Sequence, residues 1–291
     1  MRSPRKGLTG NISQGLCCDI LFFVSLTSSE ALDVSLVLPA YNESATILDT
    51  IGAARRYFQS RGLTSQIIVS ADGDDGTREL CEGLQREMRD LVVFGSVQRG
   101  GKGRGIRRGV EAATGAIIGF ADADNKVPIE EFDRFLPLLR SGADVVIGTR
   151  VGPDARIEKA QRIYRRLGAR AFSILVQKVI DLQGIADTQC GFKFFRGPYA
   201  KAIFANQRID GYMFDVEILA LSVRMSARLH QVPIRWRDDA DSRLDLIAGN
   251  IQNLKDIFRI RRYLKKMSPN DFAYHLAVLE MRDLYPDSAL A

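Results

Sequence analysis

Two aspartates spaced one apart, Asp122 and Asp124, are the residues whose type and spacing most clearly indicate chemistry. They directly follow residues 116–120, an apolar run with the composition of a buried strand. If the strand ends there, both carboxylates can turn toward one divalent cation, and Mg²⁺ or Mn²⁺ would bridge them to a diphosphate. Aspartate is also frequent in turns, so the pair alone leaves a purely structural role open.

A glycine-rich basic loop, residues 99–105, is the second candidate site. Backbone N–H groups at a glycine-rich helix start, together with Lys102, would form a pocket for phosphate. The loop is not a Walker loop, because Lys102 is not followed by Ser or Thr, and it does not match the dinucleotide-binding fingerprint. A flexible basic loop without a ligand is the alternative.

Residues 71–77 form an acidic loop that contains Asp72 and two glycines. The glycines permit a tight turn, and acidic side chains there can accept hydrogen bonds from a base and a ribose. A calcium loop is a rival interpretation, but the spacing of an EF-hand loop is absent. A simple turn also stays open.

Residues 39–43 follow the first predicted strand. Pro39 is expected to end that strand, and Asn42 or Ser44 is expected to cap the helix that comes next. Taken alone, this segment is explained by a capped helix start.

All four segments belong to an alternation of short β-branched runs and helical stretches that begins at Asp33. This alternation predicts an α/β fold, with a mostly parallel sheet and helices on both faces. Ligands of such sheets bind at the carboxyl ends of the strands, which is where the four segments fall. The predicted strands are 34–38, 66–70, 91–94, 116–120 and 144–147, and the predicted helices include 44–59 and 76–89.

The alternation weakens after Arg150. Residues 156–180 are predicted to form a long basic helix, whose apolar residues could enter a membrane interface while its arginines meet lipid phosphates. A helix packed on the sheet fits that pattern equally well. A strand is predicted at 229–236 and a basic helix at 244–266. We therefore expect three parts. Residues 1–32 form a tail or loosely attached arm, residues 33–266 form one catalytic domain with amphipathic C-terminal helices, and residues 267–291 form a C-terminal extension.

The 291-residue chain is 46% hydrophobic, carries a net charge of +6 and has a pI near 9.2. This balance suits nucleotide phosphates, nucleic acid or anionic lipid without choosing among them. The four cysteines include no C-x-x-C pair, so zinc-site spacing is absent and reduced thiols of a cytosolic protein are expected. The apolar segment 20–26 is short of the roughly 20 residues that span a bilayer. We expect no transmembrane helix, and a cytoplasmic protein that is at most peripheral on the cytoplasmic face of a membrane.

Four motifs in this order resemble glycosyltransferase family 2, whose fold is called GT-A. They are Tyr41-Asn42-Glu43, Asp72-Gly73, Gly101-Lys102-Gly103 and Asp122-Ala123-Asp124, and the resemblance covers roughly residues 33–266. Three later stretches resemble the dolichyl-phosphate sugar synthases of that family. They are Gly148-Thr149-Arg150, residues 187–193 and residues 214–217, and the last two are most similar to the dolichyl-phosphate β-glucosyltransferase branch.

The resemblance implies a role for each matching residue. The nucleoside of the donor would be held by Pro39, Tyr41, Glu43 and Asp72. The metal and the diphosphate would be held by Asp122 and Asp124. Arg150 would meet the acceptor phosphate, Arg243 would be a further phosphate contact, and Glu217 would lie on the helix that faces the donor sugar. The loop of Asp72 is one residue shorter than the family's usual pattern. Eukaryotic glucosyl enzymes of this branch also carry an amino-terminal membrane helix, which we do not expect here.

We therefore expect an inverting, metal-dependent transferase that moves a hexose, glucose from UDP-glucose, to a polyprenyl or dolichyl phosphate. A phosphate acceptor is largely dianionic at neutral pH and needs no general base. For a hydroxyl acceptor a carboxylate base would be needed, and Asp215 or Glu217 are the candidates. The alternatives are GDP-mannose as donor, a soluble acceptor, a nucleotidyltransferase, or a non-catalytic binder of nucleotides. Nucleic acid is not an expected partner, because the basic residues are interleaved with glycine and aliphatic residues rather than with aromatic ones.

Overall fold

A computed structural model of the chain describes residues 32–152, 155–157, 175–237 and 248–267. The predicted tail and C-terminal extension therefore lie outside the described residues, apart from Leu32 and Met267. Within the described part no helix is both long and apolar enough to cross a membrane.

A mixed sheet of seven strands, in the order β3-β2-β1-β4-β7-β5-β8, forms the centre of the fold. Strands β1, β2, β3 and β4 are parallel neighbours, as are β5 and β8, whereas β7 runs antiparallel to β4 on one side and to β5 on the other. The strands are β1 (Val34–Tyr41), β2 (Ser65–Asp72), β3 (Leu91–Phe94), β4 (Ile117–Ala121), β5 (Val145–Thr149), β7 (Phe192–Arg196) and β8 (Leu229–Pro233). Two short strands, β6 (Arg156–Ile157) and β9 (Arg235–Trp236), form a separate parallel pair.

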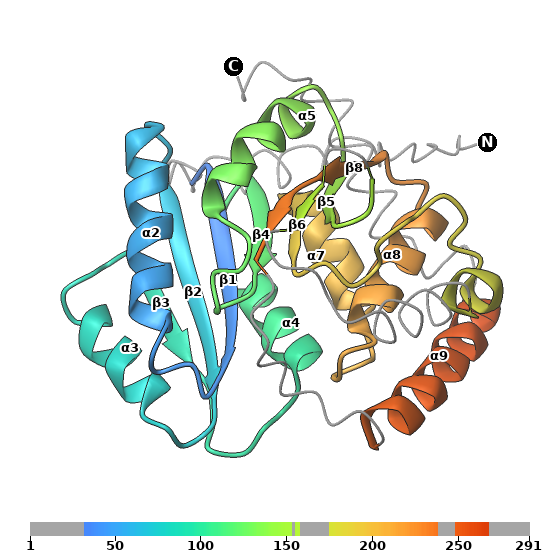
Figure 1. Cartoon of the computed structure of the whole chain (residues 1–291), viewed down its shortest axis with the longest axis horizontal. Helices are drawn as coiled ribbons and strands as arrows, with labels where there is room; N and C mark the ends of the chain where they lie inside the picture. Colours follow the sequence, from blue (N-terminus) through green and yellow to red (C-terminus); the bar gives the residue numbers. More distant parts are fainter. Residues whose placement is uncertain (1–31, 153–154, 158–174, 238–247, 268–291) are drawn as a thin grey trace, which may run out of the picture. The chain divides into compact units, whose positions relative to one another are not determined.

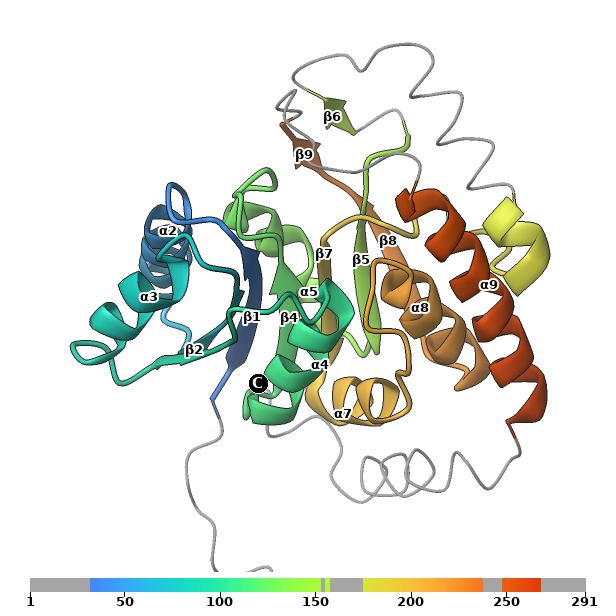
Figure 2. The same ribbon diagram turned by 90° about the horizontal axis from the view of Figure 1, so that it is seen from below.

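Helices cover both faces of the sheet, as the sequence predicted (Figures 1 and 2). Alternate residues of β1 point to opposite faces, so Leu36 and Val37 belong to two different hydrophobic clusters. On the side of Leu36 lie α2 (Ile47–Ser60), α3 (Thr77–Gln85), η1 (Ile129–Arg134) and α5 (Leu136–Arg140). On the side of Val37 lie α4 (Lys102–Ala112), α7 (Gly197–Ala205), α8 (Phe214–Arg224) and α9 (Ala248–Lys266).

The first strand is longer than predicted, because Pro39 does not end it. Strand β4 pairs with β1 only as far as Val37, so Pro39 has a strand neighbour on one side and the missing N–H is tolerated there. The expected helix caps are also wrong. Helix α2 starts at Ile47 after Thr46, while Asn42 Oδ1 accepts a hydrogen bond from the N–H of Asp74 at 3.2 Å and so ties the β1 loop to the β2 loop.

The region after β5 differs most from the prediction. Residues 156–157 form strand β6, so the long helix predicted for 156–180 does not begin there; its helical part among the described residues is 175–180. The strand predicted at 229–236 is divided between two sheets, as β8 and β9. The basic helix predicted at 244–266 is confirmed over α9.

Candidate active site

Asp122 and Asp124 lie where β4 ends, as their position in the sequence predicted. The N–H of Asp122 donates to the carbonyl of Gly191 at 3.1 Å, and Asn125 adopts a left-handed backbone with φ of 52°, so the chain turns sharply after the pair. A Cβ at Gly191 would come 2.0 Å from Oδ2 of Asp122. Only glycine therefore leaves room for this carboxylate beside the segment that leads into β7.

Two lysines contact the pair of carboxylates. Lys102 Nζ lies 2.5 Å from Oδ1 of Asp122, and Lys126 Nζ lies 2.8 Å from Oδ2 of Asp124. Burial lowers the pKa of Lys102, but the charges of Asp122, Asp215 and Asp124 outweigh it and raise this pKa above its ordinary value. Lys102, the first residue of α4, is therefore protonated and positively charged at neutral pH.

Near Lys102 lies a buried ion pair that no local pattern of the sequence predicts. Lys193 is fully buried within β7, and its Nζ donates to Oδ1 of Asp215 at 2.5 Å and to the carbonyl of Cys190 at 2.6 Å. Burial raises the pKa of Asp215, while Lys193 and Lys102 oppose that rise. We call Lys193, Asp215, Lys102 and Asp122 the inner charge cluster, in which positive and negative groups alternate.

The two carboxylates predicted as alternative bases are already engaged. Asp215 is 3% exposed and bound to Lys193. Glu217 accepts hydrogen bonds from the N–H groups of Arg208 and Ile209, at 2.8 to 3.0 Å, and so fastens the loop before α8. Burial raises the pKa of Glu217 to about 7 against these hydrogen bonds. This geometry does not favour a base role for either carboxylate.

The loops that follow β1, β2 and β3 meet beside the carboxylate pair, and Asp72 joins two of them. Its carboxylate accepts hydrogen bonds from the N–H of Ser96 at 3.2 Å and from the N–H of Gly100 at 2.7 Å. Asp72 thereby positions the glycine-rich loop from which α4 starts. The resemblance assigned Asp72 to the nucleoside, and that role stays a prediction.

Tyr41 and Arg99 form the exposed rim of these loops. Tyr41 ends β1 and is 38% exposed, and the guanidinium of Arg99 lies 4.2 Å from the centre of its ring. Arg99 also donates to the hydroxyl of Tyr212 at 2.7 Å. Nearby, Glu43 accepts a hydrogen bond from the hydroxyl of Thr46 at 3.1 Å. The nucleoside roles predicted for Pro39, Tyr41 and Glu43 are not tested by these contacts.

Arg150 follows β5 and is held in a fixed orientation by Asp187. Its Nε and Nη2 donate to the two carboxylate oxygens of Asp187 at 2.7 and 2.9 Å, and its guanidinium lies 5.3 Å from the ring centre of Trp236. Burial lowers the pKa of Arg150, but Asp187 and, to a smaller extent, Asp122 raise it above its ordinary value. Arg150 follows β5 and Asp122 follows β4, and because both strands run against β7, the two residues lie at the same edge of the sheet. Arg243, predicted as a second phosphate contact, lies outside the described residues.

Among the described residues no three His, Cys, Asp or Glu side chains cluster as a complete metal cage. Asp122 and Asp124 would supply only part of a coordination shell, which suits Mg²⁺ or Mn²⁺, because these cations commonly share their ligands between carboxylates and substrate phosphates. The carboxylate oxygens of the two aspartates are ligands that these cations prefer, and Asp122 already contacts one positive charge, the ammonium group of Lys102. A cation therefore fits at this place.

Comparison with known proteins decides the family. Residues 35–204 match the family described as Glycosyl transferase family 2. The chain belongs to this family. It is a glycosyltransferase with a GT-A-like fold, as the motifs implied.

Named relatives include two dolichyl-phosphate β-glucosyltransferases. The protein of Dictyostelium discoideum is 29% identical over 245 residues, covering 79% of this chain and 75% of the relative. The human protein is 31% identical over 256 residues, covering 82% of this chain and 78% of the relative. Relatives over this much of their length place the chain among enzymes that transfer hexoses.

Two solved structures of similar fold are described as synthases of a glucosyl and of a mannosyl derivative of 3-phosphoglycerate. Glucosyl-3-phosphoglycerate synthase from Mycobacterium tuberculosis, in complex with UDP, has a TM-score of 0.58 at 22% identity and covers 79% of this chain and 80% of its own. Mannosyl-3-phosphoglycerate synthase from Rubrobacter xylanophilus has a TM-score of 0.60 at 18% identity, covering 82% and 77%. The mycobacterial enzyme also forms a complex with Mn²⁺, UDP and phosphoglyceric acid. These similarities support the fold.

Proposed function

We propose that this protein transfers glucose from UDP-glucose to a polyprenyl or dolichyl phosphate, with inversion at the sugar. One observation carries the proposal: the Asp122–Lys102 contact and the anchored cation Arg150 follow β4 and β5, which both run against β7 and therefore end at the same edge of the sheet. A site with carboxylates for a metal and two fixed cations suits a reaction between two phosphorylated substrates. The names of the relatives supply the sugar and the lipid class.

Asp122 and Asp124 would hold Mg²⁺ or Mn²⁺, which neutralises charge on the leaving nucleoside diphosphate when it is bound. Lys102 adds a fixed positive charge at the same place, and the charge of Asp215, itself paired with Lys193, helps to keep it protonated. The chain's own contribution to catalysis is thus electrostatic stabilisation of the leaving group and orientation of the donor.

The acceptor would be held by Arg150. A phosphate monoester with a second pKa near 6 is already a nucleophile at neutral pH, so no side chain has to remove a proton. This agrees with the engagement of Asp215 and Glu217 in other contacts. Asp187 fixes the guanidinium fork of Arg150 and so reduces the entropy lost when phosphate binds.

A soluble phosphorylated acid is the second candidate acceptor, because the mycobacterial enzyme of the same fold is described in complex with phosphoglyceric acid. GDP-mannose is the second candidate donor. The proposed reaction takes place on the cytoplasmic face of a membrane if the acceptor is a lipid.

The test is a transfer assay with purified protein, Mg²⁺ or Mn²⁺, labelled UDP-glucose or GDP-mannose, and either a polyprenyl phosphate or 3-phosphoglycerate. We expect label from UDP-glucose to enter the organic phase, and Asp124→Ala to abolish this transfer. Glu87→Ala, at an exposed position after the end of α3 and before the start of β3, is the matched control and should transfer normally. Transfer only to 3-phosphoglycerate would overturn the lipid acceptor and keep the transferase.

A further inference from the structure

Helix α9 has an outward stripe that the proposed reaction does not use. Its inward residues Ile257 and Ile260 are 0% and 1% exposed and pack into the core. On the outward side, Ile251, Leu254 and Phe258 are 58%, 41% and 51% exposed. These three positions are separated by three and four residues, which places them in one row along the helix.

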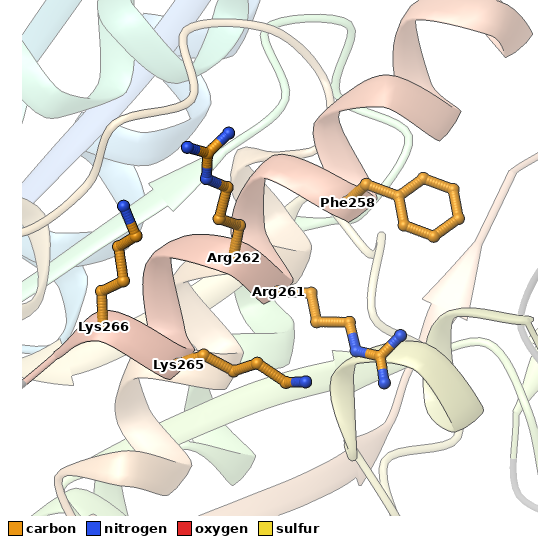
Figure 3. A pocket seen from close by; sticks show the side chains of 5 residues that line it. All are labelled: Phe258, Arg261, Arg262, Lys265 and Lys266. Carbon is orange, nitrogen blue, oxygen red and sulfur yellow. The ribbon is translucent and has the colours of Figure 1, made fainter.

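The same row continues with cations toward the end of the helix. Arg261 and Lys265 extend the spacing of the apolar residues, and Arg262 and Lys266 lie next to them. Together with Phe258 these four side chains line a shallow hollow, and Figure 3 shows them fanning out from successive turns of α9. Among the described residues, no ion pair joins any of the four to a carboxylate. The surface therefore combines an apolar half with a cationic half.

Packing fixes which way this surface faces. The guanidinium of Arg208 stacks on the ring of Tyr263 at 3.7 Å from its centre, and α9 contacts α8 along its inward side. The helix cannot roll its outward stripe into the core without losing these contacts. Helical residues 175–180 lie beside α9 in both views and expose Leu175 and Lys178, which adds an apolar and a basic group (Figures 1 and 2).

We propose that this α9 surface, defined by Ile251, Leu254, Phe258 and the four cations after them, docks the protein on an anionic lipid bilayer. Apolar side chains at this spacing enter the boundary between headgroups and acyl chains, while lysines and arginines meet lipid phosphates. A second copy of the chain is a poor occupant, because two such surfaces would repel each other. The proposal does not depend on the proposed reaction, since binding to vesicles needs neither donor nor acceptor.

The test measures binding of the whole protein to vesicles of phosphatidylcholine with and without phosphatidylglycerol. We expect binding to the anionic vesicles only, and weaker binding at higher salt. Each cation near an anionic surface contributes about a fivefold gain in partitioning, so Arg261→Gln with Lys265→Gln should weaken binding by roughly 25-fold. Phe258→Ser should weaken it as well, because an interfacial apolar contact is lost.

The matched control is Arg86→Gln with Arg89→Gln, which removes the same charge from exposed positions at and after the end of α3. It should bind anionic vesicles nearly as the unchanged protein does, and circular dichroism should show that both double variants are folded. Equal loss in the two double variants would overturn the proposal, because it would show that only net charge matters. Binding to soluble polyglutamate that survives Phe258→Ser, without binding to vesicles, would overturn it in favour of an acidic protein partner.

Discussion

Replacing Lys193 by methionine should destabilise the protein strongly, although the two side chains are similar in length. Lys193 is fully buried, and its ammonium group is held by Asp215 and by the carbonyl of Cys190. Methionine fills much of the same space but leaves the carboxylate of Asp215 buried without its closest counter-charge. The cost is therefore the desolvation of an uncompensated carboxylate rather than a loss of packing.

Removing one partner of a buried ion pair costs about 3–5 kcal/mol in free energy of unfolding. Removing both charges costs much less, because no buried charge is then left without a partner. The double variant Lys193→Met with Asp215→Asn should thus be more stable than the single variant Lys193→Met. The expected coupling energy between the two positions is about 2 kcal/mol, within the range for residues in direct contact.

Urea unfolding of the two single variants and the double variant gives this coupling energy. The exposed pair Arg61–Asp133, with side chains 50% and 43% exposed, is the matched control. Breaking that pair by Arg61→Met should cost about 0–1 kcal/mol. A loss below about 1 kcal/mol for Lys193→Met, or a coupling energy near zero, would refute the reasoning that Lys193 and Asp215 compensate each other inside the fold.

Three further predictions concern the site. Gly191→Ala should leave the fold intact but displace Asp122, whose oxygen lies 2.0 Å from the added Cβ, and should lower kcat by about 100-fold, as misplacement of a catalytic group by about 1 Å can do. Arg150→Lys should raise the KM for the phosphate acceptor more than the KM for the donor, because lysine cannot keep the two-pronged contact with Asp187. The protein should lose stability as the pH rises from about 5 to about 8, because the folded-state pKa of Glu217 is raised to about 7 and its protonated form is the one that folding favours. Glu217→Gln should flatten this dependence, which amounts to about 3 kcal/mol.

Each of these three has a result that contradicts it. Normal turnover by Gly191→Ala would mean that the position of Asp122 is not critical. A donor KM that rises as much as the acceptor KM would remove Arg150 from the acceptor side. For Glu217, the measurement is thermal unfolding of the unchanged protein and of Glu217→Gln at pH of about 5 and about 8. If the stability of the variant depends on pH as much as that of the unchanged protein, another group is responsible.

The sequence sufficed to predict what depends on local pattern. The β-branched runs placed five strands within a few residues of their observed ends, and the acids after them were correctly expected at the carboxyl edge of the sheet. Strand β7 escaped the prediction, since its sequence Phe-Lys-Phe-Phe-Arg carries a lysine inside an otherwise buried run. A charged residue in such a run suggests exposure, and its burial is explained by the distant carboxylate of Asp215 together with the carbonyl of Cys190.

Other side-chain pairings could not be predicted either, because their partners also lie far apart in the sequence. Arg150 and Asp187 are 37 positions apart, and Arg99 and Tyr212 are 113 positions apart. Such contacts depend on which strands become neighbours, and nothing in the local spacing reports that. The lysine in residues 187–193 was the available signal, because a buried cation requires a carboxylate somewhere in the fold.

The antiparallel direction of β7 has a consequence for how acceptor preference can change. Because β7 runs against its neighbours, its first residue pairs with the last residue of β4, and the segment just before it crosses the site between Asp122 and Arg150. The loops proposed to hold the donor, by contrast, all come from the parallel strands β1 to β4. If Arg150 holds the acceptor, as proposed, substitutions at residues 187–189 should alter the acceptor preference, whereas Gly191 has to be kept, because an added Cβ would meet the carboxylate of Asp122.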